Sequence, residues 1–140
     1  MVMRGEGTII NVSGMLAFSG PVPIEKLPLR RAVYTGTLAH LVALSQALHE
    51  ELKPQGLRIQ VLCPGVVKTE FHERQGLDLS AVPRMSADHV VTASLRGLVM
   101  DEVLCAPGVE KSELLDAVLN ANLAAFAAQA PQLAERYRTS

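Results

Sequence analysis

The sequence predicts an α/β fold: a short parallel sheet of about three strands with flanking helices, in a single domain formed by residues 1–140. Short runs rich in β-branched residues alternate with longer segments whose apolar residues recur at helical spacing. The order strand, helix, strand, helix, strand, helix is typical of parallel strands joined by right-handed crossovers. A chain of 140 residues can bury one ordinary core, which indicates one domain.

The first half of the chain predicts a strand, a loop and a long helix. GTIINVS, residues 7–13, is a β-branched run between glycines, as in a buried strand. GPVPIEKLPLR, residues 20–30, contains three prolines and is predicted to be a surface loop. An amphipathic helix is expected from about Arg31 to Lys53, and Pro54 ends it. The leucines that recur at helical spacing in it are Leu38, Leu41, Leu48 and Leu52.

The second half repeats the alternation. LRIQVLC, residues 57–63, predicts the second strand, and PGVVKTEF is the loop that leaves it. A helix is expected after Ser86, whose hydroxyl can cap the first turn. EVLCAPG, residues 102–108, predicts a third short strand. A helix in the alanine-rich residues 112–129 and a last helix after Pro131 complete the predicted elements.

Composition excludes several classes of function. Thirteen basic and fourteen acidic residues are spread without a basic block, so nucleic acid is not an expected partner. No stretch approaches the roughly 18 uninterrupted apolar residues that a membrane helix needs, and the N-terminal residues lack the apolar core of a signal peptide. Cys63 and Cys105 do not have the spacing of a metal site, so no metal is expected. With only these two cysteines, a cytoplasmic location is expected.

Three motifs identify a family resemblance. GTIINVSG is followed by AVY at the start of a long helix, and then by LRIQVLCPGVVKTEF. Together they resemble the second half of a short-chain dehydrogenase/reductase, over about Arg4 to Val109. The resemblance implies a partial Rossmann-like fold and NAD(P)-linked interconversion of an alcohol and a carbonyl compound. It also implies that the family's phosphate loop and first four strands would precede Met1, so we expect cofactor binding and activity to be impaired in this chain alone.

The resemblance assigns the catalytic positions one by one. The family uses a tyrosine as general acid, a lysine that lowers the pKa of that tyrosine, and a serine that binds the substrate oxygen. Tyr34 matches the tyrosine, but Leu38 occupies the lysine position. Gly14 occupies the serine position, and Ser13 could substitute only if the chain turns sharply there. No cation replaces the lysine, since His40 is expected about 240° around the helix from Tyr34.

The loop after the second strand matches the part of the family that holds the nicotinamide. The matching residues are Pro64, Gly65, Val67 and Thr69. The cofactor implied is NAD or NADP, and the substrate is a small alcohol or carbonyl compound. A proline and a glycine also end many strands, so the pair by itself does not indicate a cofactor site.

Two alternatives to a reductase stay open. The chain could be a catalytically inactive pseudoenzyme or an oligomerisation and interaction module, because an open sheet edge and the leucine-rich helix would expose apolar surface. A homo-oligomer or a complex with a partner chain is therefore expected. An unrelated hydrolase activity on the same scaffold is ranked last, because the sequence contains no G-x-S-x-G nucleophile elbow.

Overall fold

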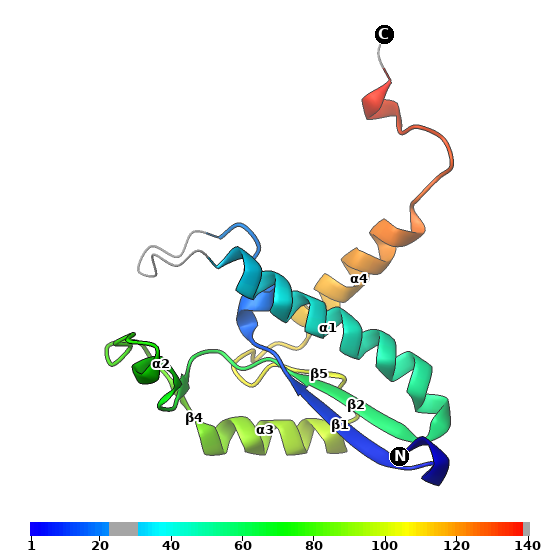
Figure 1. Ribbon diagram of the computed structural model, residues 1–140. Coiled ribbons are helices and arrows are strands. Elements are labelled where there is room, and N and C mark those ends of the chain that lie inside the picture. The colour runs from blue at the N-terminus through cyan, green and yellow to red at the C-terminus, as the bar shows by residue number, and fades with distance from the viewer. Residues whose placement is uncertain (23–30, 139–140) are drawn as a thin grey trace. The chain divides into compact units, whose positions relative to one another are not determined.

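The computed structural model describes residues 1–22 and 31–138, which fall into two units (Figure 1). The first unit runs from Met1 to Gly108 and contains every strand, and the second runs from Val109 to Ser140. Most of the predicted proline-rich loop, at 23–30, lies outside the described residues. The prediction of a single domain stays a prediction.

The main sheet has three parallel strands in the order β1-β2-β5, as predicted. Strand β1 (Gly7–Val12) pairs along its whole length with β2 (Leu57–Leu62), and β2 pairs with the short β5 (Leu104–Cys105). Because the strands are parallel, their carboxyl ends meet at one edge of the sheet. This edge brings Gly14 and Pro64 together: the N–H of Met15 donates to the Pro64 carbonyl at 2.9 Å.

Helix α1 (Ala32–Leu52) confirms the long helix and covers one face of the sheet (Figure 1). Its buried residues are Leu38, Val42, Ser45 and His49. Of the four leucines that predicted the helix, only Leu38 belongs to this buried face, and the other three are partly exposed. The leucines therefore predicted the wrong centre for the buried face of the helix. The polar residues Ser45 and His49 occupy buried positions where periodicity predicts apolar residues.

One of those polar residues is accommodated by hydrogen bonds. The Ser45 hydroxyl donates to the Leu41 carbonyl at 2.7 Å and accepts from the Asn11 side chain at 3.0 Å. Ser45 is completely buried, and a buried hydroxyl costs free energy unless it is paired. The Asn11 to Ser45 bond thus joins β1 to α1 just before the end of the strand.

Helix α3 (Ala87–Val99) covers the other face, over β2. Ser86 caps it as predicted, accepting from the N–H of His89 at 3.2 Å. Beneath it the fully buried Gln60 and Ser94 bond to each other twice: the Ser94 hydroxyl donates to Gln60 Oε1 at 2.6 Å, and Gln60 Nε2 donates to the Ser94 carbonyl at 3.1 Å. Both polar ends are therefore satisfied inside the core.

The two crossovers have opposite hands, so the prediction that both are right-handed was wrong. In β2, Val61 packs with Val42 of α1, whereas its neighbour Gln60 bonds to α3. Because adjacent strand residues point to opposite faces, α1 and α3 lie on opposite faces of the sheet. The connections from β1 to β2 and from β2 to β5 both move in the same direction across the parallel strands, so their hands differ. The handedness rule applies to a strand that feeds directly into its helix. Here the connection from β2 to α3 is long and contains a further strand pair.

That connection contains a separate two-stranded ladder and a short helix. Strand β3 (Val67–Lys68) pairs with β4 (Met85–Ser86), and α2 (Phe71–Arg74) lies between them in the chain. Single 3₁₀ turns complete the first unit: η1 (Val2–Arg4), η2 (Met15–Phe18) and η3 (Lys53–Gln55).

The second unit contains helix α4 (Glu113–Ala127), as predicted, and a 3₁₀ turn, η4 (Glu135–Tyr137). Among the described residues after Pro131, the expected last helix is only that single 3₁₀ turn. None of the helices in the described part of the chain is both long and apolar enough to cross a membrane.

Candidate functional site

The candidate site lies where the carboxyl ends of β1 and β2 meet the first two turns of α1. Tyr34 is in the first turn of that helix, with 51% of its surface exposed. About half of this residue is therefore open to solvent. The tyrosine position predicted from the sequence is thus on the helix that the resemblance requires.

Gly14 and Leu38 face each other at this edge. A Cβ atom added to Gly14 would lie 3.5 Å from Leu38 Cδ1 and 3.6 Å from the Pro64 carbonyl oxygen, which is ordinary van der Waals contact. The backbone of Gly14 is extended, with φ of −179°, so any residue can adopt it. The structure therefore brings the predicted serine and lysine positions together, and a serine side chain would fit at position 14.

Ser13 points elsewhere. Its hydroxyl is buried and donates to the backbone carbonyl of Leu38 at 2.9 Å. This bond joins the end of β1 to α1, and it uses the proton that the predicted catalytic role would need. The adjacent Cys63 is completely buried, and that burial raises the pKa of its thiol above its ordinary value.

The structure puts no described cation at the Leu38 position. The Arg31 guanidinium donates to the Ser19 hydroxyl and to the Val22 carbonyl. His40 is exposed on α1, and Arg30 lies outside the described residues. Leu38 itself is buried, at the position where the family has a charge.

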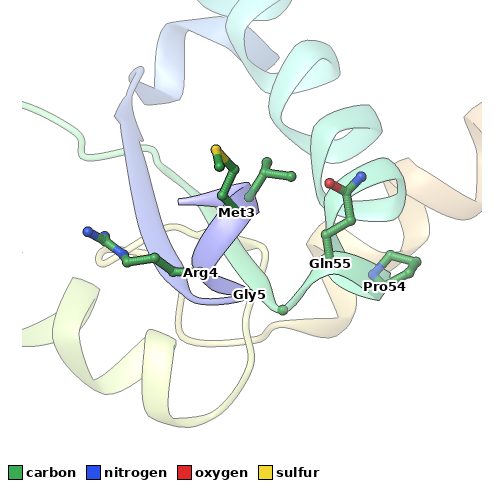
Figure 2. A pocket seen from close by; sticks show the side chains of 7 residues that line it. Met3, Arg4, Gly5, Pro54 and Gln55 are labelled. Atoms are coloured by element: carbon green, nitrogen blue, oxygen red, sulfur yellow. The ribbon is translucent and has the colours of Figure 1, made fainter.

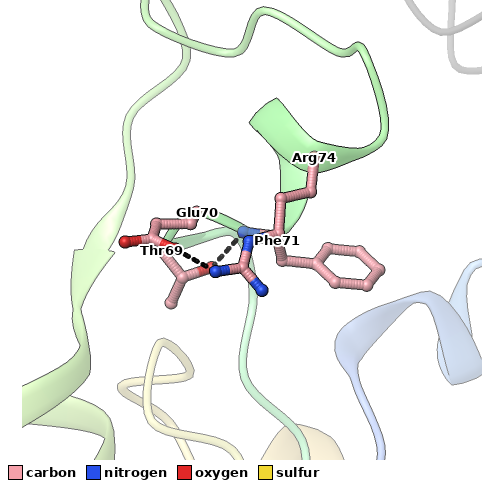
Figure 3. A network of polar contacts seen from close by, with 4 residues as sticks. All are labelled: Thr69, Glu70, Phe71 and Arg74. Carbon is pink, nitrogen blue, oxygen red and sulfur yellow. Dashed lines mark hydrogen bonds and ion pairs between the residues drawn. The ribbon is translucent and has the colours of Figure 1, made fainter.

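The predicted cofactor loop leaves β2 at the same edge. Gly65 has open space where a side chain would be, and Val67 is held in the β3–β4 ladder. Figure 3 shows the end of this loop, where the Thr69 hydroxyl accepts from the N–H of Phe71 at 3.3 Å. Thr69 also helps to line a shallow surface depression with Phe71 and the Glu70–Arg74 ion pair.

A second depression lies at the opposite, amino-terminal end of β1 and β2 (Figure 2). It is an open surface lined by η1 and by residues around η3, including Met3, Arg4 and Gln55. None of the predicted site residues borders it. We therefore locate the candidate site at the carboxyl edge, where the side chains with relevant chemistry are.

Comparison with known proteins identifies the family. A family model described as short chain dehydrogenase matches residues 1–79, more than half of the chain. This chain belongs to the short-chain dehydrogenase family. The family region spans β1, α1, β2 and the loop after β2, which contribute all the candidate site residues.

Relatives of known sequence agree. This chain is 38% identical over 69 residues to 2-keto-3-deoxy-L-fuconate dehydrogenase of Xanthomonas campestris, a match that covers 49% of this chain and 21% of the relative. It is 36% identical over 75 residues to the very-long-chain 3-oxoacyl-CoA reductase of Mus musculus, covering 54% of this chain and 22% of the relative. The matched part of the chain thus spans about a fifth of the length of these relatives.

Solved structures extend the match to nearly the whole chain. A short-chain dehydrogenase from Sphingobium yanoikuyae in complex with NADPH superposes with a TM-score of 0.86 and 29% identity, over 98% of this chain and 52% of that one. A bulky-bulky ketone specific alcohol dehydrogenase from Comamonas testosteroni has the same fold, with a TM-score of 0.80 and 23% identity, over 99% and 49% of the two chains. This chain therefore has about half of a known oxidoreductase fold.

Proposed function

We propose that this chain contains the substrate side of an NAD(P)-linked alcohol and carbonyl oxidoreductase site in a strongly impaired form. The observation that supports this most is the contact between positions 14 and 38, where Gly14 and Leu38 stand in place of a hydroxyl and a cation. Tyr34 alone has the functional group that the family uses.

The chemistry explains the impairment. A phenol exchanges its proton efficiently near neutral pH when a neighbouring positive charge stabilises the phenolate. Leu38 supplies no charge, and its burial places a hydrocarbon beside the turn that bears Tyr34. Gly14 supplies no hydrogen bond to a substrate oxygen. Tyr34 could orient a carbonyl compound, but it would do so without the two groups that assist proton transfer.

The residues present fit one end of a dinucleotide only. Pro64, Gly65, Val67 and Thr69 would hold the nicotinamide, and Gly65 leaves space for its approach. When bound, the nicotinamide would supply or accept a hydride. The sequence contains no G-x-G-x-x-G segment to receive the pyrophosphate at a helix N-terminus.

A pseudoenzyme that acts as an interaction module is the second candidate. The observation that favours it is the exposure of apolar side chains on β1 and α1, including Val12 and Val33. The hydrolase alternative gains nothing from the structure, since the hydroxyl of Ser13 is already bonded to the backbone.

A chimera tests the proposed function. The half of the Sphingobium yanoikuyae protein that lies outside the match would be fused before this chain, and NADPH-dependent reduction of a panel of ketones and aldehydes would be measured. We expect background turnover in the unmodified chimera and at least about a hundredfold more with Leu38→Lys and Gly14→Ser together, since acid–base groups contribute about 10²–10⁴-fold. Tyr34→Phe should abolish the gain.

The matched control is Gly36→Ser, which adds a hydroxyl to an open position of α1. It should not raise turnover with or without Leu38→Lys. If the unmodified chimera already reduces carbonyl compounds at the rate of the double variant, the proposed impairment is wrong.

A further inference from the structure

Helix α4 has a wide apolar face that nothing in its own unit buries. Successive helical residues are about 100° apart, which places six large apolar side chains on one half of the helix. They are Leu114, Leu115, Val118, Leu119, Leu123 and Phe126. Glu113, Asp116 and Asn120 form a polar stripe on the other side. No residue of α4 is buried, and each of the six apolar side chains except Leu115 is exposed.

Asn122 lies in the middle of this apolar face. It is about 180° around the helix from Glu113, between Val118 and Leu115. An amide inside an apolar contact costs free energy unless it is hydrogen-bonded. Because a carboxamide both donates and accepts, two Asn122 side chains can satisfy each other across a two-fold axis. A single asparagine of this kind also fixes the register of paired helices. A second copy of this chain therefore matches the one polar group that a purely apolar partner would leave unpaired.

We propose that α4 pairs with the α4 helix of a second copy of this chain, in antiparallel orientation, with the two Asn122 amides hydrogen-bonded at the two-fold axis. An axis beside Asn122 places Val118 of one copy near Phe126 of the other, and Leu119 near Ala125. In the second of these pairs a large side chain meets a small one, which lets the two helices approach closely.

The charges at the two ends of the second unit favour the antiparallel orientation. Glu113 and Asp116 lie in the first turn of α4, whereas the two arginines of this unit, Arg136 and Arg138, follow the helix. An antiparallel pair brings the acidic first turn of each copy to the end where the other copy has its arginines. A parallel pair would place the carboxylates of both copies side by side and point both helix dipoles the same way, and each of these costs free energy.

The length of α4 predicts a dimer that dissociates on dilution. A helix of 15 residues is about 22 Å long, so two of them cover less area than a permanent interface does. We expect a dissociation constant on the order of micromolar or higher. Helix α4 lies outside residues 1–79, which the family model matches, so the inference depends neither on that match nor on the proposed function.

Cross-linking of the full chain tests the contact at the axis. Asn122→Cys and Asn120→Cys are matched variants, since each replaces an asparagine of α4 with a thiol, and the native Cys63 and Cys105 are buried. At a chain concentration of about 100 µM and under mild oxidation, Asn122→Cys should form a disulfide-linked dimer at least about tenfold faster than Asn120→Cys. The reason is that only position 122 of the two copies lies within bonding distance.

A mixed cross-link distinguishes the two orientations. Val118→Cys and Phe126→Cys chains should cross-link to each other faster than either variant cross-links to itself, because the antiparallel pair places these two positions together. Faster self-linking of each variant would mean a parallel pair and would refute the proposed orientation.

A charge at position 122 tests the equilibrium by sedimentation velocity. Asn122→Asp sets two carboxylates against each other at the axis and should raise the dissociation constant at least about tenfold. Asn120→Asp makes the same change on the polar stripe and should leave the dissociation constant unchanged. An equal mixture of Asn122→Asp and Asn122→Lys chains should dimerise again, which separates loss of the contact from loss of the helix.

Three results would overturn the proposal. The first is a full chain that stays monomeric up to about 1 mM. The second is a dimer that Asn122→Asp does not weaken, which would mean that another surface forms the interface. The third is an effect of Asn122→Asp on the free energy of unfolding that is independent of concentration and comes without a cross-link, as expected if α4 packs against the first unit of its own chain. None of these measurements involves catalysis, so failure here is distinct from failure of the proposed function.

Discussion

At the scale of single residues, the backbone approach between Gly5 and Gly56 holds the amino ends of the first two strands together. A Cβ atom on Gly56 would lie 2.0 Å from the carbonyl oxygen of Gly5, and Gly56 also has a positive φ of 77°. Gly5 lies just before β1 and Gly56 just before β2, so the close approach occurs at the amino ends of the paired strands.

Two alanine substitutions separate backbone strain from this steric contact. Gly76 also has a positive φ, 73°, but open space around it, so Gly76→Ala should lower the free energy of unfolding by about 1–2 kcal/mol through strain alone. Gly56→Ala should lower the free energy of unfolding by about 1–3 kcal/mol more than Gly76→Ala does, because the backbone must also move to make room for the methyl group. Urea unfolding of both variants measures the difference, and equal losses would contradict the close approach.

Alkaline pH provides a second residue-scale prediction. Burial, the charge of Glu102 and the neighbouring Cys63 raise the pKa of Cys105 from 9.0 to about 11. Above pH 9.0 the unfolded chain releases this proton while the folded chain retains it, so the free energy of unfolding should fall as pH rises toward 11.

The variant Cys105→Ala isolates that effect. Below pH 9 its difference from the parent in the free energy of unfolding should be constant, and above pH 9 the difference should shrink because only the parent has this thiol to titrate. Chemical denaturation at a series of pH values measures it. A constant difference up to pH 11 would refute the assignment.

Some residue positions could be predicted from the sequence and others could not. The placement of Tyr34 at the start of a helix, and of Leu38 one turn later, follows from local spacing. The burial of Ser45 could not be predicted, because it depends on a tertiary hydrogen bond from Asn11, which lies 34 residues away in the sequence. The Ser13 hydroxyl similarly finds its partner 25 residues away.

At the scale of elements, capping determines where α3 begins. The Ser86 hydroxyl accepts from a first-turn N–H, whereas the side chain of Ser112 at the start of α4 makes no such bond. Ser86→Ala should lower the free energy of unfolding by about 1 kcal/mol, and Ser112→Ala should change it little. Thermal unfolding monitored by circular dichroism compares them. Equal effects would mean that Ser86 does not act as a cap in solution.

The elements themselves were predictable where periodicity is strong. The three main-sheet strands and α1, α3 and α4 lie where β-branched runs and helical spacing predict them. The hand of the crossovers was not predictable, because it depends on which face α3 packs against. Gln60 and Ser94 contribute to that choice, and nothing in their local sequence indicates that they are partners.

At the scale of the whole molecule, the fold matches about half of a solved short-chain dehydrogenase. In the proposed function the loop at the carboxyl edge would hold only the nicotinamide, and the sequence contains no G-x-G-x-x-G segment for the phosphates. NADPH titration by fluorescence or calorimetry should show no saturable binding at micromolar concentrations. The solved Sphingobium yanoikuyae protein is the positive control, since its structure contains NADPH. Micromolar binding by this chain would mean that another segment holds the phosphates.

The single open face of β1 also has an evolutionary consequence. In β2 every residue except Arg58 is buried, so a saturation mutagenesis library selected for folding should retain few substitutions there. In β1, tolerance should instead alternate, with Asn11 restricted and Ile10 and Val12 free to vary. Ile10 and Val12 should tolerate many substitutions in the isolated protein. If they tolerate few substitutions in cells, selection there acts on a surface that a bound strand would cover. The substitutions that each condition permits would then show whether the edge is used.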